Sequence, residues 1–325
     1  MKTRNHGLRR FLGFSLALGL VLGVAAGAWA TGTSYVLPDG QGSWALPKGV
    51  HVGRAPSAAI EVEIRGIGTF LVDPSEVKAL RPDVFRPGHL SVFDAVAHLV
   101  GQGTIQATYR LDLSMNTHVI ESLNGRVGWW YDAHYPGGKF ERTTVRMDHY
   151  PVKGGMKILL YLEQPDRLAA IYTSFQEEVA RLAANQGRVV IPEVTIRGPR
   201  GSLTFRDLPV TPHDVRSDVF RPGVVTALDV LLSLGELGNL SGLRLTWRTR
   251  VGETEPVENY YVDLIAGTDF SAEAVSPCAF VYDVGAEILT EFKPPHGHTA
   301  AQIHLSFDLH VLASPEHVKW AWVCP

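Results

Sequence analysis

The chain has 325 residues, of which 45% are hydrophobic and 19% are charged, and its formal net charge is −3 at pH 7. This composition is typical of folded globular domains and excludes a largely disordered chain. A mildly acidic protein also has no electrostatic reason to bind nucleic acid or anionic lipid.

Residues 1–30 have the pattern of a secretory signal peptide. A short basic segment precedes an apolar run from Phe11 to Gly27, and Ala28 and Ala30 provide small residues at the −3 and −1 positions of a cleavage site. Cleavage after Ala30 would remove four basic residues and no acidic ones, which takes the formal charge from −3 to −7. We therefore expect a secreted or extracytoplasmic protein without membrane insertion after signal removal.

An uncleaved anchor is the alternative for the same segment, because the apolar run approaches the roughly 20 residues that span a bilayer. The protein would then be held at the cell surface by its N-terminus. No cysteine follows the run, so we do not expect a bacterial lipoprotein anchor.

Residues 31–57 are rich in Gly, Pro and Ser and predict an extended leader, with a short strand near Ser34–Leu37. Alternating apolar residues from Ile60 to Ile64 then indicate a strand, followed by a turn and a second strand over 69–72. Ser91 and Asp94 have the spacing of a capping box, which predicts a helix that ends at Gly101. Further strands are predicted over 104–113, 117–123, 128–135, 143–150 and 156–162.

Residues 165–187 differ from the strands on either side. Leu168, Ile171, Phe175 and others recur at helical spacing, and Gly187 provides a stop. The pattern predicts an amphipathic linker helix. It lacks the basic polar face of a membrane-surface helix, so we expect it to pack on the protein.

The segment Asp83-Val84-Phe85-Arg86-Pro87-Gly88 recurs unchanged at residues 218–223, 135 positions later. Ser91 and Asp94 recur as Thr226 and Asp229, which predicts a second capped helix over 226–237. We interpret the repeat as a duplicated domain. Strands are expected in the second copy over 189–197, 243–250, 259–264 and 280–283, and a closing strand over 303–311. We expect each hexapeptide to form a turn before its helix, with Arg86 and Arg221 paired to Asp83 and Asp218.

Three motifs in the first copy resemble the transcobalamin C-terminal-like domain family. They are His118–Gly125, which ends in Leu-Asn-Gly, then Gly128-Trp129-Trp130-Tyr131, and then Tyr150–Ile158 with its Tyr-Pro-Val-Lys-Gly-Gly turn. The resemblance covers about residues 59–163, and the second copy joins it through the internal repeat. It implies a small β-grasp-like domain of secreted and surface proteins.

The expected fold is therefore α+β, with two tandem β-grasp-like domains that each carry a mixed or antiparallel sheet and one short helix. The boundaries are 1–30 for the signal, 31–57 for the leader, 58–164 for the first repeat, 165–187 for the linker helix and 188–325 for the second repeat with its tail. No helical toroid of the kind that holds cobalamin is visible. We therefore expect no cofactor, and cobalamin is suggested by the resemblance only.

Aromatic residues near the first Asn-Gly turn are the candidates for ligand binding, with Trp129 and Trp130 pointing to opposite faces of one strand. If one face is exposed, it offers an aromatic platform; the alternative is that both rings are packed. The full candidate set is Trp129, Trp130, Tyr131, Tyr135, Asn124 and Tyr282.

Other chemistry has weaker signals. Cys278 and Cys324 are the two cysteines, and in an oxidising compartment they predict one disulfide. His296 and His298 are weak metal candidates, and the interpretation as a solvated loop is favoured. His304 and His310 would share one face of the predicted 303–311 strand but lie too far apart to hold one ion. The chain has no Gly-x-Ser-x-Gly, His-Glu-x-x-His or phosphate-loop motif.

These observations favour a non-catalytic, secreted or cell-surface protein that binds a small molecule or a protein partner. A structural or assembly module of the cell envelope is the alternative. A cobalamin- or metal-binding protein is a third hypothesis.

Overall fold

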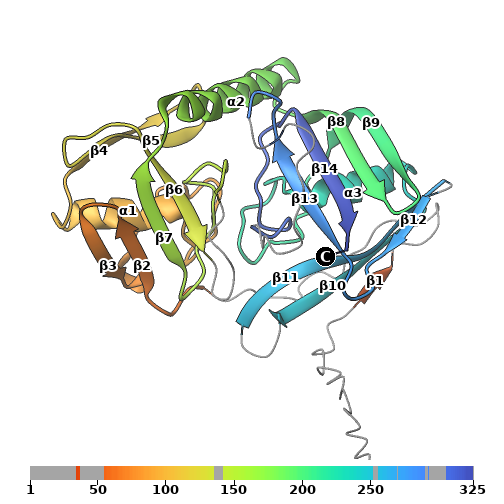
Figure 1. Ribbon diagram of the computed structural model, residues 1–325, viewed down its shortest axis with the longest axis horizontal. Coiled ribbons are helices and arrows are strands. Elements are labelled where there is room, and N and C mark those ends of the chain that lie inside the picture. Colours follow the sequence, from red (N-terminus) through yellow and green to blue (C-terminus); the bar gives the residue numbers. More distant parts are fainter. Residues whose placement is uncertain are drawn as a thin grey trace, which may run out of the picture.

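The computed structural model describes residues 34–36, 55–134, 142–251, 255–268, 270–289, 292 and 305–324. Figure 1 shows a mixed α+β molecule with one group of elements on the left, a second group on the right, and a long helix across the top of both. None of the four sheets in the described residues is closed. The predicted signal peptide and most of the predicted leader lie outside the described residues.

The N-terminal half is built on a four-stranded sheet with the order β3-β2-β7-β6. Its strands are β2 (Ile60–Ile64), β3 (Gly68–Val72), β6 (Trp129–His134) and β7 (Lys157–Leu162). The central pair, β2 and β7, is parallel, and the outer pairs are antiparallel. The apolar residues of β2 all point into the core, as their alternation predicts.

Two other units complete this half. The helix α1 (Val92–Gly101) starts at the predicted capping box, in which the Ser91 and Asp94 side chains each accept a backbone N–H of the other residue. The strands β4 (Ala107–Asp112) and β5 (Thr117–Leu123) form a separate antiparallel hairpin. A 3₁₀ turn, η1 (Pro74–Glu76), lies between β3 and α1.

The C-terminal half repeats this plan with the order β9-β8-β14-β13, and its central pair, β8 and β14, is again parallel. Its elements are β8 (Val189–Gly198), β9 (Gly201–Val210), α3 (Ala227–Glu236), β13 (Ala279–Gly285) and β14 (His317–Val323). The hairpin of β10 (Gly242–Val251) and β11 (Glu255–Gly267) corresponds to β4–β5. It is flanked by β1 (Ser34–Val36) and β12 (Phe270–Glu273).

The predicted amphipathic helix is confirmed as α2 (Pro165–Ala184), which packs on both halves (Figure 1). Ile171 and Phe175 are buried in the core of the N-terminal half. Near the other end, the Arg181 guanidinium donates to the Ser314 carbonyl at 2.9 Å. The apolar stripe is therefore used for packing.

The two copies of the hexapeptide meet face to face between the halves. Phe85 and Phe220 form an antiparallel bridge, their ring centroids are 5.5 Å apart, and both side chains are buried. The amide of each following arginine donates across the junction, Arg86 to the Val219 carbonyl and Arg221 to the Val84 carbonyl, both at 2.9 Å. The two hexapeptides thus form the joint, that is, the direct contact between the two halves of the molecule.

The predicted pairing inside each hexapeptide is wrong. Asp83 and Asp218 bind Arg81 and Arg216, which lie two residues earlier. The Arg86 and Arg221 side chains instead donate to the carbonyls of Phe220 and Pro82 in the opposite half. The reason is that each hexapeptide faces the other, so a carbonyl of that copy, or of the residue just before it, is within reach of the arginine.

Two predicted strands are also wrong. Residues 143–150 and the described part of 303–311 are loops, and the closing strand of the second half is β14. Both loops carry carbonyl groups to the first turn of a helix. Val92 and Ala227 donate their amides to the Tyr150 and His310 carbonyls, each at 2.9 Å. These loops thus satisfy free N–H groups in the first turns of α1 and α3, so these carbonyls are used at helix starts and not in a sheet.

The predicted disulfide is confirmed. Cys278 and Cys324 are bonded, with Cα atoms 4.1 Å apart, next to the paired ends of β13 and β14. The bridge ties the C-terminal strand to its neighbour. Among the described helices, none combines the length and the apolar character needed to cross a membrane.

Candidate functional site

The aromatic candidates of the first repeat are packed inside the protein. Trp129 is 1% exposed and Trp130 is 3% exposed, and Tyr131 is fully buried. Each has a hydrogen-bond partner: Trp129 donates to the Arg126 carbonyl, Trp130 to that of Thr143, and Tyr131 to that of Val145. Trp130 also contacts Tyr172 and Phe175 of α2. These rings therefore offer no exposed platform, and they belong to the core.

The other candidates are not brought together with them. Asn124 lies in an exposed turn with φ 48°, and its side-chain oxygen accepts from the Gln106 amide. Tyr282 is buried in the other half, beside Trp320 and His310. Tyr135, His296, His298 and His304 lie outside the described residues. Within the described residues, no group of three potential ligands could hold a metal ion.

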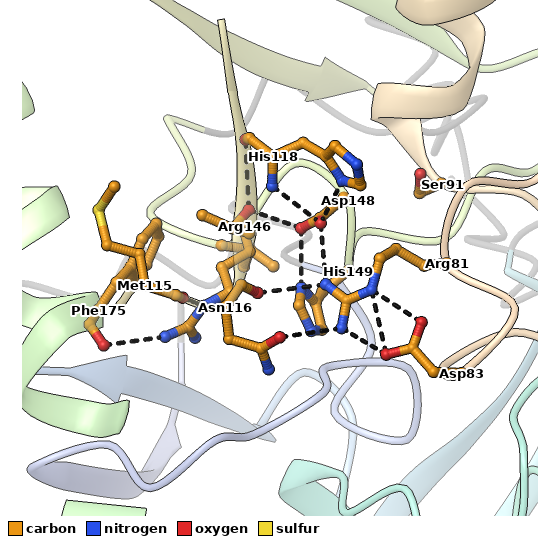
Figure 2. A network of polar contacts seen from close by, with 12 residues as sticks. Arg81, Asp83, Ser91, Met115, Asn116, His118, Arg146, Asp148, His149 and Phe175 are labelled. Carbon is orange, nitrogen blue, oxygen red and sulfur yellow. Dashed lines mark hydrogen bonds and ion pairs between the residues drawn. The ribbon is translucent and has the colours of Figure 1, made fainter. Parts of the chain in front are cut away.

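A buried carboxylate, Asp148, organises the polar residues of the first repeat (Figure 2). Each of its two carboxylate oxygens has more than one hydrogen-bond partner. One accepts from the Thr117 hydroxyl at 2.6 Å and lies 2.9 Å from the His149 ring nitrogen. The other accepts from Arg81 at 2.9 Å and from the amide of His118. The His118 ring, which also lies 2.9 Å from this oxygen, stacks on Phe93.

Opposing effects set the charge of Asp148. Burial alone would raise its pKa, but the His149, His118 and Arg81 groups outweigh burial and hold the pKa well below the usual value. Asp148 is therefore a permanent anion that fixes the β5 edge and the loop before α1 in one arrangement.

The second repeat contains the same arrangement. Arg216 binds Asp308 at 2.6 Å and Asp218 at 2.9 Å, and Asp308 accepts from the Tyr260 amide as Asp148 does from His118. Burial opposes the charge of Arg216, but Asp308 and Asp218 outweigh burial and raise its pKa. Because the network is duplicated along with the fold, we interpret it as a structural frame in both halves.

A pocket lies beside this frame, between the two halves. Its volume is about 230 Å³. It is lined by residues 55–58, His89, residues 151–154, Arg216, Val219, residues 257–258 and Leu309. The first repeat thus supplies one wall and the second repeat supplies the other. Concave sites at such junctions are a common position for small-molecule binding.

Lys153 is the principal polar group of the pocket. It belongs to the Tyr-Pro-Val-Lys-Gly-Gly turn of the first repeat, and its ammonium reaches across to β11, where it donates to the Val257 carbonyl and, at 2.7 Å, to the Asn259 side chain. Its side chain is part-exposed, while the ammonium at its end is enclosed. Desolvation, helped by the positive charge of Arg216, lowers the pKa of Lys153 to about 7.

Three other ionisable groups line the pocket: the Arg216 guanidinium described above, His89 and Glu258. Burial lowers the pKa of His89, so its ring is neutral at neutral pH. Glu258 has a left-handed backbone with φ 48°, which is unusual for a residue other than glycine. The pocket therefore combines a neutral imidazole, a guanidinium, a carboxylate and an amine that gains or loses its proton near pH 7. Such a group can bind either an anion or a neutral hydrogen-bonding molecule.

Gly154 shows how closely the wall is packed. A Cβ at this position would lie 2.9 Å from the Ala58 amide nitrogen and 3.3 Å from the Ala58 Cβ. A side chain would therefore push residues 57–58 away from the turn. The glycine that follows Lys153 allows the two parts of the wall to meet.

Sequence reasoning included Lys153 and Gly154 in a family motif but did not select them as site residues, and it missed His89 altogether. No sequence signal marks Lys153, because the residues that enclose it come from β11 and the second hexapeptide. Comparisons of the chain with family models, with curated proteins and with solved structures found no match. The resemblance to the transcobalamin C-terminal-like family therefore stays a prediction.

Proposed function

We propose that this chain is an extracytoplasmic, non-catalytic binding protein that holds a small molecule in the junction pocket around Lys153. The observation that carries the proposal is the pocket itself, which is concave and has an enclosed ionisable amine with a pKa near 7. Its volume of about 230 Å³ suits a ligand of a few heavy atoms to small-metabolite size.

The fold part of the proposal is that each half is a β-grasp-like domain. A strand pair, a helix, and a last strand placed parallel to the first support this description in both halves. The three motifs of the transcobalamin C-terminal-like family support it as well. Cobalamin itself is a poorer candidate, because a pocket of this volume is far too small to enclose a corrinoid.

The location of the protein is the third part. The N-terminal sequence has the features of a secretory signal, and the Cys278–Cys324 bond is of a kind that persists in oxidising compartments. Both support export, with a cell-surface position if the signal is kept. N-terminal sequencing of the mature protein would decide between these two forms.

The second candidate function is that of an envelope assembly module that binds other proteins. Two observations favour it: the aromatic residues that first suggested a ligand are used for packing, and exposed apolar side chains lie on β3, β4 and the loop after β5. Such side chains would contact a partner protein.

Native mass spectrometry of the protein purified from its own source tests the proposal. We expect a 1:1 complex with a small molecule that is lost in Lys153→Met, which keeps the length of the side chain and removes the amine. Lys78→Met is the matched control, because Lys78 is an exposed lysine outside the pocket. A ligand that remains bound to Lys153→Met, or its absence from the wild type, would contradict the proposal. A co-purified protein in place of the small molecule would favour the assembly module.

A further inference from the structure

The hairpin β4–β5 carries an unusual row of exposed apolar residues. Tyr109, Leu111 and Leu113 alternate along β4 and the start of the turn, and their exposed fractions are 37%, 44% and 77%. The alternate positions are polar and carry Thr108, Arg110 and Asp112. One face of the strand is thus apolar, and on this face the Tyr109 ring contacts Phe93 of the helix α1.

The corresponding hairpin in the second half has a covered edge, whereas the edge of β4–β5 is uncovered among the described residues. In the second half, the strand that corresponds to β4 is β10, and its outer edge is paired with β1 over three residues. In the part of the chain that the structure describes, β4 is paired with β5 alone. An edge of this kind, with unpaired backbone groups and apolar side chains, is a template for another strand.

The sequence of β4 is complementary to itself when read in the opposite direction. In a two-fold antiparallel pair centred on Leu111, Arg110 of each copy faces Asp112 of the other, and Tyr109 faces Leu113. Shifting the centre to Arg110 would place two arginines opposite each other. The charges therefore favour the register centred on Leu111 over the one centred on Arg110, and they add pairs across the axis to those that Arg110 makes in its own hairpin with Asp112 and Glu121. In that register the apolar faces of both strands lie on the same side.

We infer that β4 is a self-association edge, through which two copies of this chain join β4 to β4 about a two-fold axis at Leu111. The pairing would extend the two-stranded hairpin into a four-stranded sheet of the order β5-β4-β4-β5, the size that β1 and β12 give to the hairpin of the second half. This inference is independent of the ligand in the junction pocket.

Sedimentation equilibrium of the full chain over a range of concentrations tests the inference. The contact is small, so we expect reversible dimers with a Kd on the order of 100 µM. Leu111→Lys should abolish the dimer. Leu71→Lys is the matched control: Leu71 is 74% exposed on β3, another edge strand, and its substitution should leave the dimer unchanged.

A charge exchange tests the register. Arg110→Glu places a glutamate against Asp112 of the other copy, and Asp112→Lys places a lysine against Arg110 of the other copy, so each variant alone should be monomeric. An equimolar mixture of the two should regain dimers, because every cross-strand charge pair is then of opposite sign. Far-ultraviolet circular dichroism of each variant shows that it is folded. A wild type that is monomeric at about 1 mM, or a dimer that survives Leu111→Lys, would overturn the inference.

Discussion

At the scale of single residues, the most informative group is Lys153, whose amine lies between two repeats. Its surroundings lower its pKa to about 7, while an unfolded chain would give it the ordinary value of 10.5. Between these two values the unfolded chain binds more protons than the folded one. The contribution of Lys153 to the free energy of unfolding must therefore rise with pH across this range.

Comparison of wild type with Lys153→Met tests this expectation. The difference between their free energies of unfolding, measured by urea denaturation, should shift in favour of the wild type as pH rises from about 7 to 10.5. Because both proteins share all other groups, the difference isolates Lys153. A pH-independent difference would show that the amine keeps an ordinary pKa.

The two carboxylates that bind Arg81 give a second prediction. The Asp148 side chain is fully buried, whereas that of Asp83 is 62% exposed. Asp148→Asn removes a negative charge from beside the buried Arg81 guanidinium, so we expect a loss of about 3 kcal/mol in the free energy of unfolding. Asp83→Asn should cost at most about 1 kcal/mol, since its charge is screened by solvent.

The Asp148 carboxylate also predicts how the stability of the protein depends on pH. The folded pKa of Asp148 is depressed, so its contribution is complete above the ordinary pKa of an aspartate and is lost as pH falls through the folded pKa. The difference in the free energy of unfolding between wild type and Asp148→Asn, measured by urea denaturation, should therefore become smaller as the pH falls into the acid range. Equal losses for Asp83→Asn and Asp148→Asn at neutral pH would contradict the structural role of Asp148.

At the scale of elements, α2 carries two neighbouring glutamates with different surroundings. Glu178 is buried and accepts from Arg146 at 2.6 Å, and the Arg146 guanidinium lies over the Phe175 ring. Glu177 is exposed and lies 3.8 Å from Arg181.

Neutralising each glutamate separately tests how α2 is held. Glu178→Gln should lower the free energy of unfolding by about 2 kcal/mol, because a buried cation loses its counter-charge. Glu177→Gln should change it by no more than about 0.5 kcal/mol. The two substitutions are chemically identical and adjacent, so thermal denaturation of both gives a matched comparison. Equal effects would show that the buried face of α2 has been assigned wrongly.

The elements that could be predicted from the sequence are those with a strong local signal. The capping box before α1, the alternation of β2 and the helical spacing of α2 all predict what is observed. The apolar alternation in 303–311 predicts a strand, but this prediction is wrong because Leu305 and Leu309 lie in a loop whose apolar side chains are buried in the core. The sequence pattern does not predict β9 and β12. It places the closing strand at 303–311 and not at β14, although Trp320 and Trp322 alternate with other residues in β14.

The candidate site was harder to predict because its residues are remote from one another in the sequence. Lys153, Arg216 and Glu258 meet only after the halves have docked. The aromatic residues that drew attention are large, and large aromatic residues fill cores as readily as they form sites.

At the scale of the whole molecule, the two identical hexapeptides form the two sides of one contact between the halves. Each copy presents a phenylalanine, and the amide and guanidinium of an arginine, to the other copy, as the two sides of a pseudo-symmetric contact do. The loops that carry Asp148 and Asp308 lie close to this joint and position the walls of the pocket. A change in one copy would therefore act on both halves.

The pocket depends on this junction, so the junction is the feature to test first. The most direct measurement is the nuclear Overhauser effect between the ring protons of Phe85 and Phe220 in protein with selectively labelled phenylalanine. With the ring centroids 5.5 Å apart, cross-peaks between the two rings are expected, and they should disappear on Phe220→Leu, which also serves to assign them. If well-resolved spectra contain no contact between these rings, the halves do not meet at the hexapeptides, and the pocket around Lys153 does not exist as described.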